Sequence, residues 1–258
     1  MFTNLSFYMI DPISHPQKLA EDIQSLGNAC GILGTILIAE EGVNANTCGT
    51  EQQSFVFLEG LKAIDARFSS LWIKKSTGDI PSFQRFESRH EPDVLSFESP
   101  LNLSVDDIQS GGRISADDFK KAVLNLDQEP DTVIIDTRNE YEIDYGKFKN
   151  AISFDIRHFR DFIPKFLERF GEQKNKTYLM YCTGGIRCEK ATAALNKLGF
   201  AHAKQLDGGI LGYFESAGDA GYEGNCFVFD HRWAVTPELA QSADGPHPSQ
   251  IPKPSSKG

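Results

Sequence analysis

The sequence lacks the segments that would direct a protein into or across a membrane. Its first ten residues contain no basic side chain and lead straight into Asp11-Pro12. No later run approaches the roughly 20 apolar residues that a membrane-spanning helix requires. We therefore expect neither an export signal nor a membrane partner, and the sequence predicts a soluble, cytoplasmic protein.

Cysteine is scarce and irregularly placed. The 258 residues include five cysteines, an odd number without regular spacing, which argues against a disulfide framework. Cys30, Cys48 and Cys226 have no metal-ligand spacing with one another or with the six histidines. The sequence therefore predicts no metal site, and no flavin, haem or iron motif identifies a cofactor.

Basic residues are fewer than acidic ones, with 26 Lys and Arg against 36 Asp and Glu. A formal net charge of −10 at pH 7 argues against broad, non-specific binding of nucleic acid, which depends on neutralising phosphates. A polynucleotide partner would have to bind a local basic surface. The best candidate interleaves basic and aromatic side chains: Lys74, Lys75, Arg85 and Arg89, with Phe83 and Phe86. A solvated basic face explains these residues equally well.

The chain is long enough for two domains, and its patterns differ between the two halves. The first half predicts a strand over 4–10, a helix that starts near Ser14 and ends at Gly27, strands over 34–39 and 42–47, a helix over 50–68 and a strand over 71–75. This order is typical of a split βαβ, ferredoxin-like α+β domain.

Strands and helices alternate in the second half, which predicts an α/β domain with a mainly parallel sheet covered on both faces. The expected domains are 1–94 and 113–222, with a linker at 95–112, a C-terminal extension at 223–241 and a disordered Pro- and Ser-rich tail at 242–258. Sites in such sheets lie at the carboxyl ends of the strands, where Cys182 and Asp136 fall.

The most informative stretch is the turn at Cys182. It follows a buried strand, 177–181, and precedes a helix predicted over 189–198. Backbone amides of such a turn favour a negative charge, lower the pKa of a thiol and make it a nucleophile. The loop would form an anion cradle from Thr183, Gly184, Gly185, Ile186 and Arg187. A small buried hydrophobic side chain is the alternative for Cys182, but the glycines and Arg187 favour a reactive role.

Loop length separates two chemistries. Cysteine phosphatases place five residues between the cysteine and the arginine, whereas four separate Cys182 from Arg187. The tighter ring suits sulfur or another small group better than a phosphoester.

Three further residues have two interpretations each. Cys188 could resolve an oxidised or persulfidated Cys182 as a disulfide, or it could simply pack in the helix. Asp136 and Arg138 could orient the loop from the neighbouring strand end, or the aspartate could cap a turn.

Several motifs together carry a family resemblance. Residues 135–142, 146–151, the Cys182 loop and 206–210 resemble the successive motifs of a rhodanese domain. More narrowly, residues 41–45, 83–89, 181–191 and 225–230 look like the bacterial tRNA uridine(34) hydroxylase family. That family has a ferredoxin-like domain before its rhodanese-like domain, so the resemblance spans nearly the whole folded chain.

The resemblance implies oxygen-dependent hydroxylation of carbon 5 of the wobble uridine in tRNA. Its catalytic cysteine corresponds to Cys182, molecular oxygen would be the co-substrate and the anticodon arm of tRNA the partner, with no obligate protein partner evident. Many relatives continue into a cysteine-rich tail, where this chain has its Pro- and Ser-rich segment. Two alternatives remain open: a rhodanese-type sulfurtransferase that carries a persulfide on Cys182, and a non-catalytic module that binds sulfur or RNA.

Overall fold

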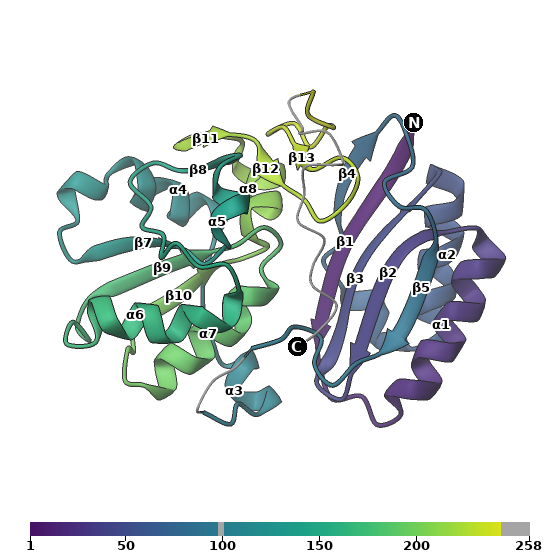
Figure 1. Cartoon of the computed structure of the whole chain (residues 1–258), viewed down its shortest axis with the longest axis horizontal. Coiled ribbons are helices and arrows are strands. Elements are labelled where there is room, and N and C mark those ends of the chain that lie inside the picture. Colours follow the sequence, from purple (N-terminus) through teal and green to yellow (C-terminus); the bar gives the residue numbers. More distant parts are fainter. Residues whose placement is uncertain (98–100, 244–258) are drawn as a thin grey trace.

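The computed structural model describes residues 1–97 and 101–243, which form two domains lying side by side (Figure 1). Residues 244–258 of the expected tail lie outside the described residues. Ser242, at its start, is buried and its hydroxyl accepts a hydrogen bond from Asn225. No helix within the described ranges is both long and apolar enough to cross a bilayer.

The N-terminal domain confirms the split βαβ prediction. Its elements are β1 (Phe2–Ile10), α1 (Pro16–Cys30), β2 (Leu33–Ala39), β3 (Gly42–Gly49), α2 (Glu51–Ile64), η1 (Ala66–Ser70), β4 (Lys74–Gly78) and β5 (Phe86–His90). The sheet order is β4-β1-β3-β2-β5. The last of these strands, parallel to β2, was not predicted from the sequence. It extends the ferredoxin-like order by one edge strand.

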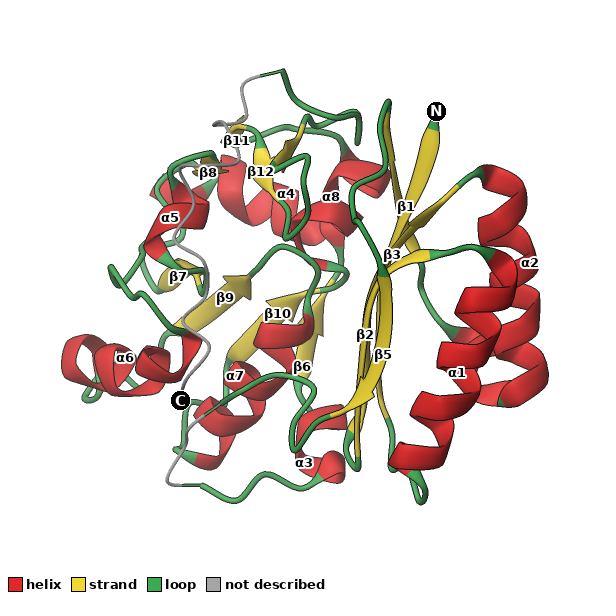
Figure 2. Ribbon diagram, turned by 45° about the vertical axis from the view of Figure 1, so that its right-hand side comes forward, coloured by secondary structure: helices red, strands yellow, loops and turns green. Residues whose placement is uncertain are grey.

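The two faces of this sheet have different partners. Leu5, Phe7 and Met9 of β1 join the core formed with α1 and α2. The alternate residues, such as Ser6 and Tyr8, point to the opposite face because side chains alternate along a strand. Figure 2 shows that this opposite face is turned toward the second domain. The sheet is therefore covered on one face by its own helices and on the other by the second domain.

The second domain confirms the parallel α/β prediction. Its sheet has the order β6-β10-β9-β7, and every neighbouring pair is parallel. The elements are β6 (Gly112–Ile114), α4 (Ala116–Leu124), η2 (Leu126–Gln128), β7 (Thr132–Asp136), α5 (Glu140–Ile143), β8 (Gly146–Phe148), η3 (Phe159–Asp161), α6 (Phe162–Phe170), β9 (Thr177–Tyr181), α7 (Ile186–Lys197), β10 (Ala203–Leu206), α8 (Gly209–Ala217) and β11 (Tyr222–Gly224). Helix α7 begins at Ile186, three residues earlier than predicted, so the Cys182 turn is tighter than expected.

Two connecting segments join the domains. The segment 95–112 contains α3 (Val105–Gln109), whose Gln109 side chain donates a 2.7 Å hydrogen bond to the Ile10 carbonyl of β1. The C-terminal extension holds β12 (Cys226–Phe227) and β13 (Ala234–Val235). Beyond β12, Arg232 donates to the Ser76 hydroxyl at 2.8 Å and so ties the extension to β4. Described residues of both segments therefore contact strands of the N-terminal sheet.

Candidate active site

The Cys182 turn is fixed from both sides. Gly185 has φ +106, and its N–H donates to the Cys182 sulfur at 3.1 Å. A Cβ atom at Gly185 would lie 2.9 Å from the Tyr8 hydroxyl, so glycine is required for conformation and for space. On the other side, the Ile210 N–H at the start of α8 donates to the Cys182 carbonyl at 2.9 Å. The loop is thus clamped between α8 and β1.

These contacts make Cys182 a thiolate site. Burial alone would raise the pKa of this thiol, which is 1% exposed. A hydrogen bond from the Cys188 thiol, the charge of Arg187 and the amides of Cys188 and Gly185 outweigh burial and lower the pKa to about 6. The sulfur therefore carries a negative charge at neutral pH, as a nucleophile needs.

Cys188 is the protonated partner of this pair. It is fully buried, and burial followed by the adjacent Cys182 thiolate holds its pKa well above the ordinary value. Its sulfur also lies 3.5 Å from the Thr137 hydroxyl. Cys188 thus acts as a hydrogen-bond donor to Cys182, a contact that neither of the two interpretations of the sequence anticipated.

The sequence analysis placed Arg187 in the anion cradle. In the structure its guanidinium is bound to another side chain of the protein. Both ends of its guanidinium bind the carboxylate of Glu142 on α5, with Nη2 to Oε2 at 2.7 Å, and Glu142 is fully buried. The arginine keeps its electrostatic effect on Cys182, while its Nη1 and Nη2 atoms both donate to Glu142. The contribution of Arg187 to an anion cradle therefore stays a prediction, since two of its donors are bound to Glu142 in this structure. The Cys182 sulfur accepts a hydrogen bond from the backbone amide of Gly185.

Glu142 is the site residue that sequence reasoning missed. It lies 45 positions from Arg187 and belongs to a four-residue helix, so no periodicity points to it. The sequence feature that could have indicated it is the run of charged residues at 136–142, in which Glu142 also completes a capping box with Asn139.

Asp136 and Arg138 lie behind this pair rather than against the loop. Their fully buried side chains pair with each other, with Nη2 to Oδ2 at 2.7 Å. Arg138 also donates to the carbonyl of Gly146 at 2.6 Å and to that of Glu142 at 3.4 Å. The two residues therefore position Glu142, and they reach the Cys182 loop only through it.

The N-terminal domain supplies the far wall of the site. Ser6 lies beside Gly184, with its hydroxyl 3.7 Å from where a Cβ would stand. Lys74 is 5% exposed, and its ammonium lies 4.7 Å from the Tyr8 ring centroid and 5.2 Å from that of Trp72. Burial lowers the pKa of Lys74 to about 8, and the negative charge of Cys182 offsets part of that effect.

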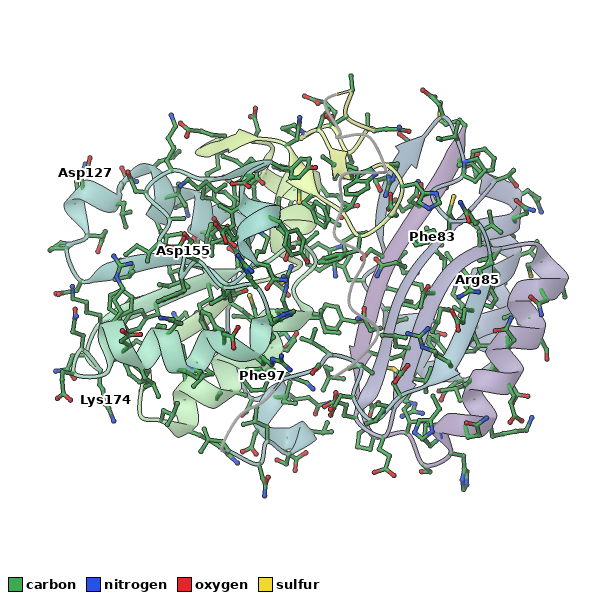
Figure 3. The ribbon with its side chains drawn as sticks, in the orientation of Figure 1. Phe83, Arg85, Phe97, Asp127, Asp155 and Lys174 are labelled. Atoms are coloured by element: carbon green, nitrogen blue, oxygen red, sulfur yellow. The ribbon has the colours of Figure 1, made fainter. Side chains whose placement is uncertain are left out.

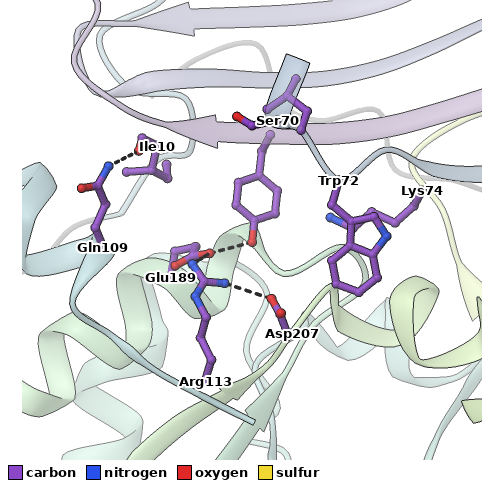
Figure 4. A pocket seen from close by; sticks show the side chains of 10 residues that line it. Ile10, Ser70, Trp72, Lys74, Gln109, Arg113, Glu189 and Asp207 are labelled. Carbon is purple, nitrogen blue, oxygen red and sulfur yellow. Dashed lines mark hydrogen bonds and ion pairs between the residues drawn. The ribbon is translucent and has the colours of Figure 1, made fainter. Parts of the chain in front are cut away.

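A cavity of about 220 Å³ lies at this domain boundary (Figure 4). Its lining includes Tyr8, Trp72, Lys74, Arg113, Glu189 and Asp207. Glu189, 1% exposed, accepts hydrogen bonds of 2.6 Å from Tyr8, Arg113 and Gln205. The next residue, Lys190, pairs with Glu41 of the N-terminal domain at 2.6 Å. The first turns of α7 therefore carry both the site and the contacts between domains.

The predicted basic surface is not one surface. Lys74 and Lys75 are in β4, whereas Arg85 and Arg89 flank or lie in β5, and these strands form opposite edges of the sheet. Four strand spacings of about 4.8 Å put the edges roughly 19 Å apart. Lys74 is buried, and Lys75 points to the other face of the sheet, as expected for neighbouring residues of a strand.

The arginines of this group are on the surface. Arg85, labelled in Figure 3, is exposed and pairs with Glu87 at 3.3 Å. Arg89 pairs with Glu87 at 3.2 Å and with Glu91 at 2.6 Å. The prediction of a single patch is therefore wrong, because β1, β2 and β3 separate its two halves. Within residues 1–97 and 101–243, no group of three or more His, Cys, Asp or Glu side chains is placed to hold a metal ion.

Comparisons with known proteins agree with this architecture. Residues 2–94 match a family described as a UPF0176 acylphosphatase-like domain, and residues 119–216 match the rhodanese-like domain. Three proteins named tRNA uridine(34) hydroxylase are similar over most of their length. That of Legionella pneumophila is 38% identical over 91% of this chain and 90% of its own. That of Bordetella avium is 38% identical over 92% and 97%. That of Xanthomonas oryzae pv. oryzae is 37% identical over 98% and 100%. The chain matches both domain families, and its sequence identity with these three proteins extends over both domains. It therefore belongs to the tRNA uridine(34) hydroxylase family.

Proposed function

We propose that this protein hydroxylates carbon 5 of uridine 34 in tRNA, with molecular oxygen as co-substrate and Cys182 as the reactive group. The observation that carries the proposal is the Cys182 sulfur, whose pKa is lowered to about 6 and which accepts a hydrogen bond from the Gly185 amide, in a chain that matches a named relative over 92% of its length. The protein would act in the cytoplasm, on the anticodon arm, where the wobble base is already unpaired and costs little to extrude.

The chemistry begins with a bond between the Cys182 sulfur and carbon 6 of the uracil ring. The electron pair of the C5–C6 double bond moves toward O4 and makes carbon 5 nucleophilic. Carbon 5 then attacks an oxygen atom of a peroxide, forming a C–O bond while the O–O bond breaks and hydroxide leaves as water. Loss of the carbon 5 proton expels the thiolate and restores the double bond.

Oxygen must first be reduced to the level of peroxide. Two electrons and two protons are needed, and we assign them to a dithiol that ends as a disulfide. In sum, uridine, oxygen and two thiols give 5-hydroxyuridine, water and one disulfide.

Mass spectrometry of tRNA nucleosides tests this scheme. The nucleosides come from a deletion strain that carries the wild-type or the variant protein and is grown under labelled oxygen. Wild type should restore 5-hydroxyuridine with one labelled oxygen, and Cys182→Ser should not. Full restoration by Cys182→Ser would exclude the cysteine from the chemistry.

A sulfurtransferase is the second proposal, because the loop has four residues between Cys182 and Arg187 and residues 119–216 match the rhodanese-like domain. In that case Cys182 would take the outer sulfur of thiosulfate, release sulfite and pass the sulfur to cyanide. Rapid thiocyanate formation that requires Cys182, together with unchanged 5-hydroxyuridine in the deletion strain, would favour this function over hydroxylation.

A further inference from the structure

The lysine at the cavity has anionic groups nearby but is not hydrogen-bonded to any of them. Within the described residues, the Lys74 ammonium forms no hydrogen bond or ion pair, and it lies over the rings of Tyr8 and Trp72. The neighbouring cation, Arg113, is by contrast bound to Glu189 at 2.6 Å and to Asp207 at 3.1 Å. A buried charge normally has a partner, so an unpaired one facing a cavity indicates that the partner is a ligand.

The cavity suits a pyrimidine ring. Its volume of about 220 Å³ is several times the roughly 30 Å³ that one water molecule occupies in the liquid. Trp72, which is 39% exposed, lines the cavity. The indole N–H donates to Glu215 at 3.1 Å, and the indole lies against Gly208 and Gly212, where a Cβ would come within 2.4 and 2.7 Å. Trp72 is thus held rigidly in place, as a stacking platform requires.

We propose, on the basis of the proposed function, that this cavity receives the uracil base, that Trp72 stacks on it and that the Lys74 ammonium donates a hydrogen bond to its O4. Cys182 does not itself line the cavity, but its charge acts on the Lys74 ammonium, so the cavity and the thiolate are linked through Lys74. When the sulfur of Cys182 binds carbon 6 of a base held there, negative charge develops on O4. A fixed cation in a site shielded from water stabilises that charge more in the transition state than in the ground state, which accelerates the step.

The same contact selects the base. An ammonium has three donors and no acceptor. The O4 atom of uracil is an acceptor, whereas cytosine carries an amino group with donor hydrogens at this position. A buried donor facing another donor is left unpaired, which disfavours cytosine. Lys74 therefore discriminates between the two pyrimidines at the atom by which they differ.

The charged and titratable groups around Lys74 define its pH response. They are Tyr8 of β1, Arg113 of β6, Cys182 and Glu189 at the start of α7, Asp207 after β10, and Glu215 of α8. Below a pH of about 8 the ammonium is protonated and can donate, and above it the donor becomes a neutral amine. The turnover rate should therefore rise through pH 6 as Cys182 ionises and fall above about pH 8.

The first experiment compares Lys74→Met with Lys62→Met, an exposed lysine of α2 that also removes one positive charge. Turnover and tRNA affinity are measured with purified full-length protein, and 5-hydroxyuridine is quantified by mass spectrometry. We expect Lys74→Met to lower kcat at least 100-fold, to change the tRNA Kd less than twofold and to remove the fall in rate above pH 8. Lys62→Met should match the wild type.

Two results would overturn the assignment of Lys74. One is a kcat that matches the Lys62→Met control. The other is a loss confined to tRNA affinity with a reduced salt dependence, which is the pattern of a phosphate contact. A purified wild type that forms no 5-hydroxyuridine would instead overturn the proposed function itself, so the two failures are distinguishable.

The second experiment does not depend on turnover. An anticodon stem–loop with 4-thiouridine at position 34 places a photoreactive sulfur where O4 would lie. Irradiation of its complex with the wild type should cross-link the peptide that contains Trp72 and Lys74, and Trp72→Leu should reduce the yield at least fivefold. Cross-links that map to the exposed aromatic residues Tyr141 or Phe229, the second of which lies over the Arg187 guanidinium, would place the base elsewhere and overturn the proposal.

Discussion

At the scale of single residues, the site depends on a buried ion pair that fixes the loop. Glu142 binds Arg187 with both carboxylate oxygens, and both side chains are almost completely buried. Removing one partner of such a pair leaves an uncompensated charge inside the protein. We expect Glu142→Gln to lower the free energy of unfolding by about 3–5 kcal/mol in denaturant titrations. Glu140→Gln, at an exposed position two residues away, should change it by less than about 0.5 kcal/mol. Equal stability of the two variants would contradict the role of the pair.

Cys188 provides a second prediction at this scale. Its thiol donates to Cys182, so Cys188→Ala should raise the pKa of Cys182, while Cys188→Ser keeps a donor and should raise it less. The measurement is the rate of alkylation by a small neutral reagent as a function of pH, with the modified cysteine identified by mass spectrometry. The wild type should have a midpoint near pH 6. A midpoint that stays the same in Cys188→Ala would exclude the hydrogen bond as a cause.

The low pKa of Cys182 also links folding to pH. A thiol with an ordinary pKa of 9.0 and a folded value of about 6 favours the folded state fully above pH 9. That contribution is lost as pH falls from 9 toward 6 and is absent below 6. Unfolding free energies of the wild type and Cys182→Ala should therefore diverge as pH rises across this window. Parallel curves would show that the thiol is not ionised in the folded protein.

At the scale of elements, a glycine explains an error in the sequence reading. Gly27 was expected to end α1, yet the helix continues to Cys30 and ends at Gly31, whose φ is +67. Gly27 serves packing instead, because a Cβ there would lie 2.1 Å from the Phe86 ring of β5. We expect Gly27→Ala to displace β5 and to destabilise the domain by about 1–3 kcal/mol, despite the better helix propensity of alanine.

The control for that prediction is Asn28→Ala, on the exposed side of the same helix, which should change stability by less than about 0.5 kcal/mol. Thermal unfolding of both variants is the measurement. A gain in stability for Gly27→Ala would show that Phe86 moves aside without cost.

Local patterns accounted for much of this level of structure. The split βαβ order and the alternation in the second domain could be read from periodicity, because each strand or helix buries a face of its own. The Cys182 turn could be placed because glycines follow a buried strand. The edge strand β5 could not be predicted, since Phe86 is the only residue of β5 in the N-terminal core and is itself only partly buried.

At the scale of the whole molecule, the domains are joined by contacts between residues far apart in the chain. Tyr8 donates to Glu189 across 181 positions, and Lys190 pairs with Glu41 across 149. No local pattern reveals such pairs, although residues 41–45 and 181–191 were both singled out as family motifs. The two motifs contact each other in the structure, because Glu41 in the turn before β3 pairs with Lys190 of α7.

This interface gives a prediction for stability. Lys190 is 5% exposed, and Glu41→Gln removes the carboxylate that pairs with its ammonium. We expect a loss of about 2 kcal/mol, the typical value for a hydrogen bond to a charged group, in equilibrium unfolding. Glu40→Gln, at an exposed neighbouring position, should leave stability unchanged within about 0.5 kcal/mol. A smaller effect at Glu41 than at Glu40 would refute the coupling.

The placement of Trp72 gives the molecule an optical reporter of its own. The chain has two tryptophans, and the other, Trp233, is buried in the C-terminal extension. A Trp233→Phe variant would leave a single indole, positioned between Gly208 of one domain and the Lys74 ammonium of the other. Its emission should shift when the domains separate or when a base stacks on it. Separation of the two domains and entry of a base into the cavity between them could then be followed in real time by fluorescence, without an attached dye.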